Sequence, residues 1–208
     1  INQVQSKEID FSKKTKLSCM VASNKSNDHS NDLYKERLHI ISWFNKFNKN
    51  DFDLYGYNWN RKIYKNKFIN KFNSLFPIFR YDFKVYKGEL ESKISILPNY
   101  KFTFCLENAC DYNGYITEKI FHCFFYNSVP IYYGPPNTND YIPKESYIDY
   151  NNFKNLKDLH KYLISIKSNE YNNYLISSKN FLYNLENTTF SIKYYCSTVI
   201  NQIVKYKN

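Results

Sequence analysis

The stretch from Tyr100 to Gly134 constrains the fold of this chain most strongly, because it reads as a strand, a polar loop, a helix and a second strand. The spacing of apolar residues predicts strands at Tyr100–Leu106 and Val129–Tyr133, with a helix at Thr117–Tyr126 between them. A helix that connects two strands in this way is typical of a βαβ unit in a parallel sheet.

A dense polar cluster lies where the first of these strands gives way to the helix. Its members are Glu107, Asn108, Tyr115, Thr117, Glu118 and Lys119. Ligands of α/β proteins bind at the carboxyl ends of the strands, and a helix N-terminus there favours anionic groups. A lysine in the first helical turn, beside a carboxylate and an amide, suits a sugar nucleotide, because lysine binds phosphate and carboxylates bind sugar hydroxyls. The plainer alternative is an exposed Glu-Lys pair in a helix that Thr117 caps.

The remainder of the chain continues the same alternation of strands and helices, and no internal repeat is present. The predicted class is therefore α/β, a Rossmann-like parallel sheet flanked by helices. Residues 1–15 are polar and aperiodic, which indicates a linker or tail, and residues 16–208 are predicted to form one domain. Further strands are expected at Lys16–Ser23, Phe52–Tyr55 and Tyr147–Asp149, and further helices from Asn31, at Ile63–Phe72, Leu156–Ile166 and Glu170–Leu185, and up to about Val204.

The formal charge of +10 raises the question of nucleic-acid binding. The lysines are scattered along the chain rather than gathered in one motif, so we expect no nucleic-acid partner. A basic surface would still attract a nucleotide diphosphate over long range.

The chain has five cysteines, and no pair of them has the spacing of zinc ligands. Cys19, Cys105 and Cys123 fall inside apolar patterns, where a reduced thiol behaves as a small hydrophobic group. We therefore expect no metal site, and we favour a location in the reducing cytoplasm. No signal peptide or long apolar run is present, but the chain begins at Ile1 without Met. Membrane association is left open, as is a Golgi location if a native N-terminus was removed.

Motifs between Ser18 and Tyr174 carry a family resemblance, including FCLEN, YNGYITEKIF, SVPIYYGPPN and YIPKESYIDYNNF. In this order and spacing they resemble the signature segment of the α-1,3/4-fucosyltransferases, an inverting family that uses GDP-fucose. The resemblance implies the carboxy-terminal, donor-binding half of a GT-B glycosyltransferase. It also implies an acceptor-binding domain, supplied in cis or in trans, that we expect to be missing from this chain.

The resemblance assigns roles to the polar cluster. Lys119 is expected to bind the diphosphate and stabilise departing GDP, and Glu118 to contact donor hydroxyls, so we predict both as catalytic. Asn108 is expected at the nucleotide. A carboxylate at a buried strand end needs a partner, so Glu107 is predicted to meet a base edge, a ribose hydroxyl or a main-chain amide. Tyr115 and Thr117 complete the expected donor pocket, although the Tyr115 ring could equally be packing.

The turn after the first strand belongs to the same predicted site. Ser23 and Asn24 match the small polar turn of the family beside the phosphates, where backbone N–H groups would form an anion nest. An ordinary turn is the alternative. Six residues after Asn24 the family normally has an arginine that clamps the diphosphate, and this chain has Ser30. Lys25 and His29 are nearby and Arg37 lies about two turns further along the predicted helix, but lysine and histidine do not reproduce a bidentate guanidinium.

The predicted function is transfer of fucose from GDP-fucose to a hydroxyl of a glycan acceptor, with inversion. The resemblance implies no essential cofactor and leaves open stimulation of the activity by a divalent ion. Two alternatives stay open: a non-catalytic sugar-nucleotide or glycan-binding module within a larger protein, and a glycosyltransferase for another nucleotide sugar. His122 and His160 fall inside predicted helices, and we expect them to be structural.

Overall fold

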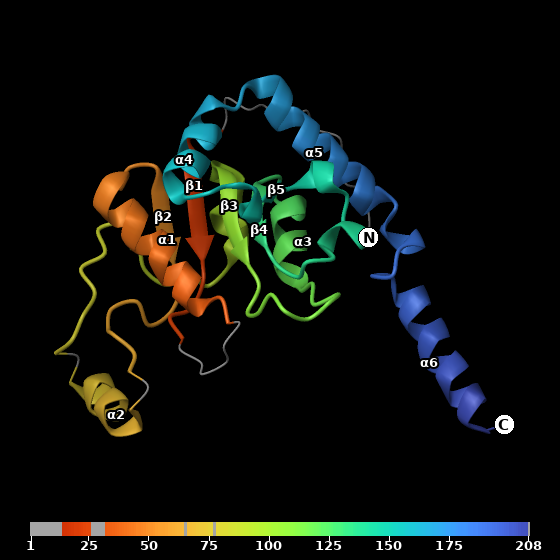
Figure 1. The fold of residues 1–208 in the computed structure, drawn as a ribbon, viewed down its shortest axis with the longest axis horizontal. Helices are drawn as coiled ribbons and strands as arrows, with labels where there is room; N and C mark the ends of the chain where they lie inside the picture. Colours follow the sequence, from red (N-terminus) through yellow and green to blue (C-terminus); the bar gives the residue numbers. More distant parts are fainter. Residues whose placement is uncertain (1–13, 26–31, 65, 77, 208) are drawn as a thin grey trace.

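The computed structural model describes residues 14–25, 32–64, 66–76 and 78–207. Its centre is a parallel sheet of five strands in the order β2-β1-β3-β4-β5 (Figure 1). The strands are β1 (Lys16–Val21), β2 (Phe52–Tyr55), β3 (Tyr100–Leu106), β4 (Val129–Tyr133) and β5 (Ile148–Asp149). This arrangement confirms the predicted α/β class.

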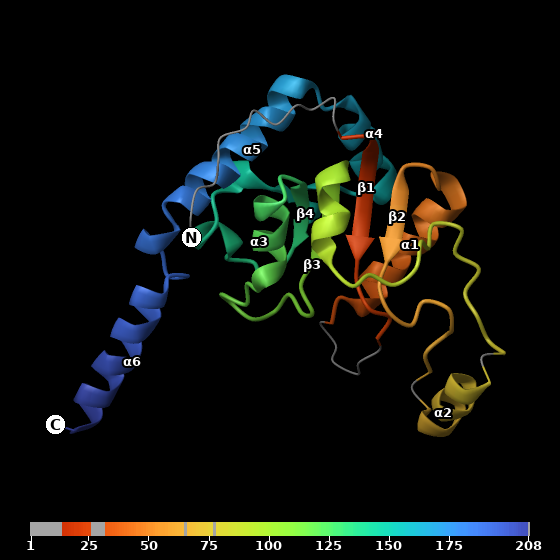
Figure 2. The ribbon, with the colours of Figure 1, turned by 180° about the vertical axis from the view of Figure 1, so that it is seen from behind.

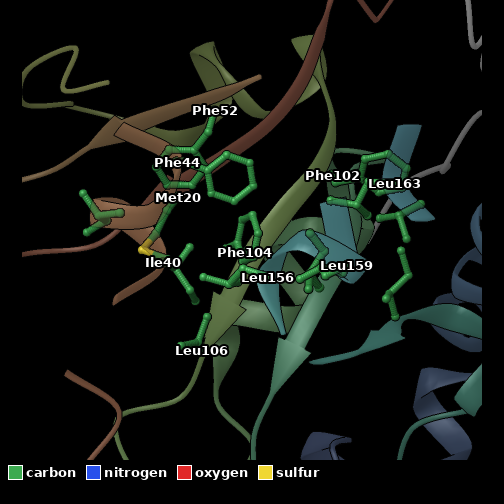
Figure 3. Packing of buried hydrophobic residues seen from close by; sticks show 14 of the residues in the cluster. Met20, Ile40, Phe44, Phe52, Phe102, Phe104, Leu106, Leu156, Leu159 and Leu163 are labelled. Carbon is green, nitrogen blue, oxygen red and sulfur yellow. The ribbon is translucent and has the colours of Figure 1, made fainter. Parts of the chain in front are cut away.

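One face of the sheet is covered by α1 (Tyr34–Phe47) and α4 (Leu156–Ser165), with part of α5 (Ser168–Tyr183). Alternate strand residues point to this face, because successive side chains of a strand lie on opposite sides. Most of them are apolar here, as Phe102, Phe104 and Leu106 of β3 illustrate. Figure 3 shows these side chains meeting the apolar sides of α1 and α4, for example Phe44 and Leu159. This side is the main core of the domain.

The opposite face carries α3 (Glu118–Phe125) and the short 3-10 turns η2 (Lys93–Ser95) and η3 (Leu97–Asn99), which Figure 2 shows in front of the sheet. The strand residues on this side include polar ones, such as Asp53, Thr103 and Glu107. Two smaller apolar clusters fill it, one around Cys105, Ile120 and Phe124 and the other around Cys19, Leu97 and Tyr100.

Two helices stand away from this body, α2 (Lys67–Leu75) and α6 (Ile192–Lys207). Figures 1 and 2 show both on the side toward which β1 points. Their apolar side chains are exposed, among them Phe68, Phe72, Ile200 and Ile203. No helix in the described part of the chain is long and apolar enough to cross a membrane.

The predicted elements agree with the observed ones except at a few boundaries. The helix predicted at Ile63–Phe72 begins at Lys67, because the Asn66 side chain accepts hydrogen bonds from the next turn and caps it there. The predicted tail ends earlier than residue 15. Lys14 is buried, and its ammonium donates to the carbonyls of Pro98 and Tyr100, so this residue packs against the sheet. Residues 1–13 lie outside the described part.

Candidate functional site

The candidate site lies between the carboxyl ends of β1 and β3. In the sheet, β1 has β2 on one side and β3 on the other. The chain moves one way from β1 to β2 and the other way from β3 onward, so the strand order reverses at this point. Crevices at such switch points are the usual ligand sites of open parallel sheets. A cavity of about 450 Å³ occupies this position and extends between α3 and η2. Its polar and charged lining includes Ser23, Lys25, Tyr34, Arg37, Glu91, Lys93, Asn108, Lys119 and His122.

Glu107, the residue after β3, anchors the site from beneath. Its side chain is fully buried and accepts four hydrogen bonds, from the backbone N–H (2.9 Å) and hydroxyl (2.7 Å) of Thr117, the Tyr132 hydroxyl (3.1 Å) and the Lys119 ammonium (2.8 Å). Burial and the adjacent carboxylate raise the pKa of Tyr132, so its hydroxyl remains a donor. Glu107 therefore ties the N-terminus of α3 to β3 and β4.

Lys119 stands above this carboxylate at the wall of the cavity. Its ammonium is 2.8 Å from the Glu107 carboxylate and 3.3 Å from Asn108 Oδ1. An ammonium has three N–H groups, so one remains for a ligand after these two bonds to described residues. The side chain is 24% exposed and lines the cavity. The arrangement holds a cation in one place and leaves it able to bind an anion.

Arg37 crosses from α1 to the end of β3 and stiffens the same corner. One guanidinium nitrogen donates to the carbonyls of Leu106 (3.1 Å) and Glu107 (2.7 Å) and to Asn108 Oδ1 (3.0 Å). The guanidinium also lies over the Tyr34 ring, 4.7 Å from its centre. Burial lowers the pKa of Arg37, but an arginine stays charged at neutral pH. The corner thus contains a second cation, fixed mainly by main-chain carbonyls.

The cavity is rich in positive charge. Lys25, Arg37, Lys93 and Lys119 line it, whereas Glu91 is the one carboxylate among its described lining residues. Glu107 lies beneath the wall and is paired with Lys119. Such a lining favours an anionic ligand, and the surrounding aromatic and apolar side chains would shield it from water.

The structure brings only part of the predicted site to the cavity. Ser23, Asn108 and Lys119 line it. Glu107 and Thr117 lie behind Lys119 and are bound to each other, so Glu107 meets a main-chain amide rather than an exposed ligand surface. Thr117 is the N-cap residue of α3, but its hydroxyl binds Glu107 instead of the helix.

Three other predicted site residues lie outside the cavity lining. The backbone N–H of Asn24 donates to the Tyr57 carbonyl and its amide to the carbonyls of Asn58 and Arg61, so the expected anion nest loses that N–H. Asn24 instead holds the loop after β2. Tyr115 is half-buried, and its hydroxyl accepts a long hydrogen bond of 3.5 Å from Asn108 Nδ2. Glu118 is exposed on the first turn of α3.

Some residues of the cavity were missed or undervalued from sequence. Arg37 falls in the buried stripe of α1 between Leu33 and Ile41, and a charge in such a stripe signals a fixed partner. His122 was expected to be structural, yet it lines the cavity three residues after Lys119. Helical spacing puts those two on one face, which was the available signal. His160 does have structural contacts, packing against Trp43 and Phe44.

Two residues that the sequence analysis singled out lie outside the described part of the chain. They are Ser30, where the family has its arginine, and His29. Within the described ranges no group of three or more His, Cys, Asp or Glu side chains is placed to hold a metal ion.

Comparison with known proteins matches residues 11–206 to the model of glycosyltransferase family 10 (fucosyltransferase), C-terminal part. The chain is 39% identical over 75 residues to the alpha-(1,3)-fucosyltransferase FucT of Helicobacter pylori, covering 36% of this chain and 15% of that protein. It is 32% identical over 135 residues to mouse 4-galactosyl-N-acetylglucosaminide 3-alpha-L-fucosyltransferase 9, covering 62% of this chain and 37% of that protein. The chain therefore spans well under half the length of these relatives.

Solved structures share the fold. A crystal structure of an alpha1,3-fucosyltransferase with GDP-fucose superposes with a TM-score of 0.51 at 22% identity, over 77% of this chain and 38% of that one. A structure of an alpha1,3-fucosyltransferase with GDP gives a TM-score of 0.52 at 23% identity over the same shares. At this identity the likeness concerns the fold, and it agrees with the Rossmann-like class predicted from sequence.

Proposed function

The chain belongs to glycosyltransferase family 10, the fucosyltransferases, and we propose that its cavity binds GDP-fucose as the donor for transfer of fucose to a glycan hydroxyl. The observation that carries the proposal is the placement of Lys119. A buried carboxylate fixes its ammonium at the cavity wall, at the switch point of the sheet, with one N–H group left over. The related crystal structures, one with GDP-fucose and one with GDP, support the choice of donor.

The proposed mechanism is direct displacement. The acceptor hydroxyl oxygen attacks the anomeric carbon of fucose from one side while the bond to the phosphate oxygen breaks on the other, which inverts the configuration. The hydroxyl proton passes to a base, and GDP departs with the electrons of the broken bond. Negative charge grows on the leaving phosphate, so Lys119 stabilises the transition state more than the ground state.

The other polar residues fill supporting roles in this proposal. Asn108 lines the cavity next to Lys119 and presents its amide to the nucleotide, while Arg37 holds that amide in place. Ser23, in the turn after β1, lines the cavity and would face the phosphates of the donor. Glu118, exposed at the start of α3, contacts hydroxyls of the fucose. Glu107 and Thr117 position Lys119 rather than touch the donor.

We assign residues 16–208, together with Lys14 and Thr15 before them, to the donor-binding half of a GT-B enzyme, and the residues before Lys14 to a linker or tail. The catalytic base and the acceptor glycan would then belong to an acceptor-binding domain acting in cis or in trans. No metal or cofactor is needed in this scheme, because the cations around the leaving group are supplied by side chains.

Calorimetric titration of the chain with GDP-fucose, GDP, GDP-mannose and UDP-galactose tests the proposal. We expect GDP-fucose and GDP to bind, and UDP-galactose to bind at least tenfold more weakly, since a base-specific site leaves polar groups unpaired with the wrong base. Lys119→Met keeps the aliphatic stem and removes the charge, and it should abolish GDP binding. Equal binding of all four compounds, or binding of none, contradicts a GDP-fucose site in this chain.

A further inference from the structure

A second pair of basic side chains lies in the same cavity, away from the residues predicted from sequence. The Lys93 ammonium, on η2, is 3.2 Å from Nδ1 of His122, on α3. Both side chains line the cavity, and His122 follows Lys119 by three residues on the helix. Residues at this spacing are neighbours on a helix surface, about 5–6 Å apart at Cβ. Lys119, His122 and Lys93 thus form one basic wall from α3 across to η2.

The hydrogen bond between Lys93 and His122 defines the protonation state of the His122 imidazole. A lysine ammonium has donors only, so a hydrogen bond between the two requires an unprotonated Nδ1 on His122. Burial and the charge of Lys93 lower the pKa of His122, and Glu118 on the preceding turn acts in the opposite direction. Lys93 takes part in no salt bridge within the described ranges. Its charge is therefore oriented by a neutral acceptor and is not cancelled by a carboxylate.

We propose that Lys93, oriented by His122, is a second phosphate-binding residue, which takes one phosphate of the donor diphosphate while Lys119 takes the other. The inference rests on the proposed function and deepens it, because it names the cation that complements Lys119. A diphosphate carries charge on two neighbouring groups, and Lys119 already donates to Glu107 and Asn108, so its remaining N–H group serves one of them. Arg37 is a poorer candidate, since it is buried and its described hydrogen bonds go to two carbonyls and Asn108.

Titration with inorganic pyrophosphate and with guanosine separates the two ends of the ligand. The variant Lys93→Gln keeps most of the side-chain length and removes the charge. We expect it to bind pyrophosphate and GDP about tenfold more weakly than the wild type, with guanosine affinity unchanged, since it loses a charge-assisted hydrogen bond. Lys157→Gln, an exposed lysine on α4 outside the cavity lining, is the matched control and should bind all three ligands normally.

Two substitutions of His122 test its positioning role. His122→Asn places an amide oxygen near the position of Nδ1 and should bind pyrophosphate within about twofold of the wild type. His122→Leu keeps the bulk but offers no acceptor, and it should bind about fivefold more weakly. Equal affinity of the two variants contradicts the positioning role, provided that thermal unfolding shows both to be folded.

The outcomes for the pair and for the donor site are distinguishable. If GDP-fucose binds and Lys93→Gln leaves GDP and pyrophosphate affinity intact, the inference fails and the proposed function stands. If Lys93→Gln loses guanosine affinity but retains pyrophosphate affinity, the pair recognises the nucleoside, and the inference also fails. If pyrophosphate binding depends on Lys93 while GDP-fucose has no preference over UDP-galactose, the anion pair stands and the proposed donor is wrong.

Discussion

The two faces of the sheet differ in what they bury. Strand residues that point toward α1 and α4 are mostly apolar, and Phe102, Phe104 and Leu106 of β3 join one continuous core. The residues between and after them, Thr103, Cys105 and Glu107, point the other way, toward α3 and the cavity. We call these the dry face and the site face. One strand therefore supplies both the core and the buried carboxylate that holds Lys119.

The difference separates stability from chemistry within single strands. Apolar side chains of the dry face contribute by area removed from water, and small changes of shape are felt there. On the site face, buried polar groups are satisfied by specific partners, and removal of one partner leaves the other unpaired. The dry face should respond to lost volume, whereas the site face should respond to lost charge or lost hydrogen bonds.

The largest effect on stability is expected on the dry face. Phe102 is fully buried and packs edge-on against Tyr171. Phe102→Ala should lower the free energy of unfolding by about 4 kcal/mol, because a large cavity replaces the ring. Thr103→Ala, at the next position on the site face, should cost about 1 kcal/mol through loss of its bond to Ser128. Urea unfolding measures both, and equal costs would erase the distinction between the faces.

A charge deletion on the site face should come next. Lys119→Met leaves the fully buried Glu107 carboxylate without its cation. It should lower the free energy of unfolding by about 3 kcal/mol and also remove GDP affinity. Adding Glu107→Gln should recover part of that stability, since no buried charge then lacks its cation, without restoring GDP binding. A double-mutant cycle by chemical denaturation measures the coupling. A coupling near zero would mean that Glu107 does not hold Lys119.

Removal of one neutral donor from the same carboxylate should have a smaller effect. Tyr132→Phe deletes the hydroxyl that donates to Glu107 and should cost about 2 kcal/mol, as a hydrogen bond to a charged group does. Tyr147→Phe is the matched control, because the Tyr147 hydroxyl donates to the neutral Asn139 amide and should cost about 1 kcal/mol. Thermal unfolding measures the loss of stability in both variants. A larger loss for Tyr147→Phe would contradict the expectation that a hydrogen bond to the charged Glu107 is the stronger one.

The smallest expected effect is a pH dependence from His122. Its pKa in the folded chain is lowered from 6.5, first by burial and then by Lys93. The unfolded chain then binds more protons around and below pH 6.5, so stability falls as the pH drops from there through the folded pKa. His122→Asn should show a shallower loss over this range than the wild type. Identical profiles in urea unfolding would show that His122 does not titrate differently on folding.

The pattern of residues along the chain was sufficient to predict the fold and the corner of the sheet where the candidate cavity lies. Strand alternation and helical spacing are local properties, and they placed β3, α3 and β4 at their observed positions to within a residue. The polar run that ends in Thr117, Glu118 and Lys119 marked the helix start at that corner. The start of α2 was predicted too early, because the Asn66 cap sets the first helical residue at Lys67, and the helix also runs past the predicted end, Phe72, to Leu75.

The partners within the site come from distant parts of the chain, and no local pattern specifies them. Arg37 reaches Asn108 from 71 residues away, and Tyr132 reaches Glu107 from 25 residues away. Periodicity tells which side of a strand or helix is buried, but the choice among buried polar partners depends on how the elements pack. The chain sequence thus determined the α/β sheet and the position of Lys119. Packing of α1, α3 and η2 against the sheet decided that Glu107 points inward and that Lys93 meets His122.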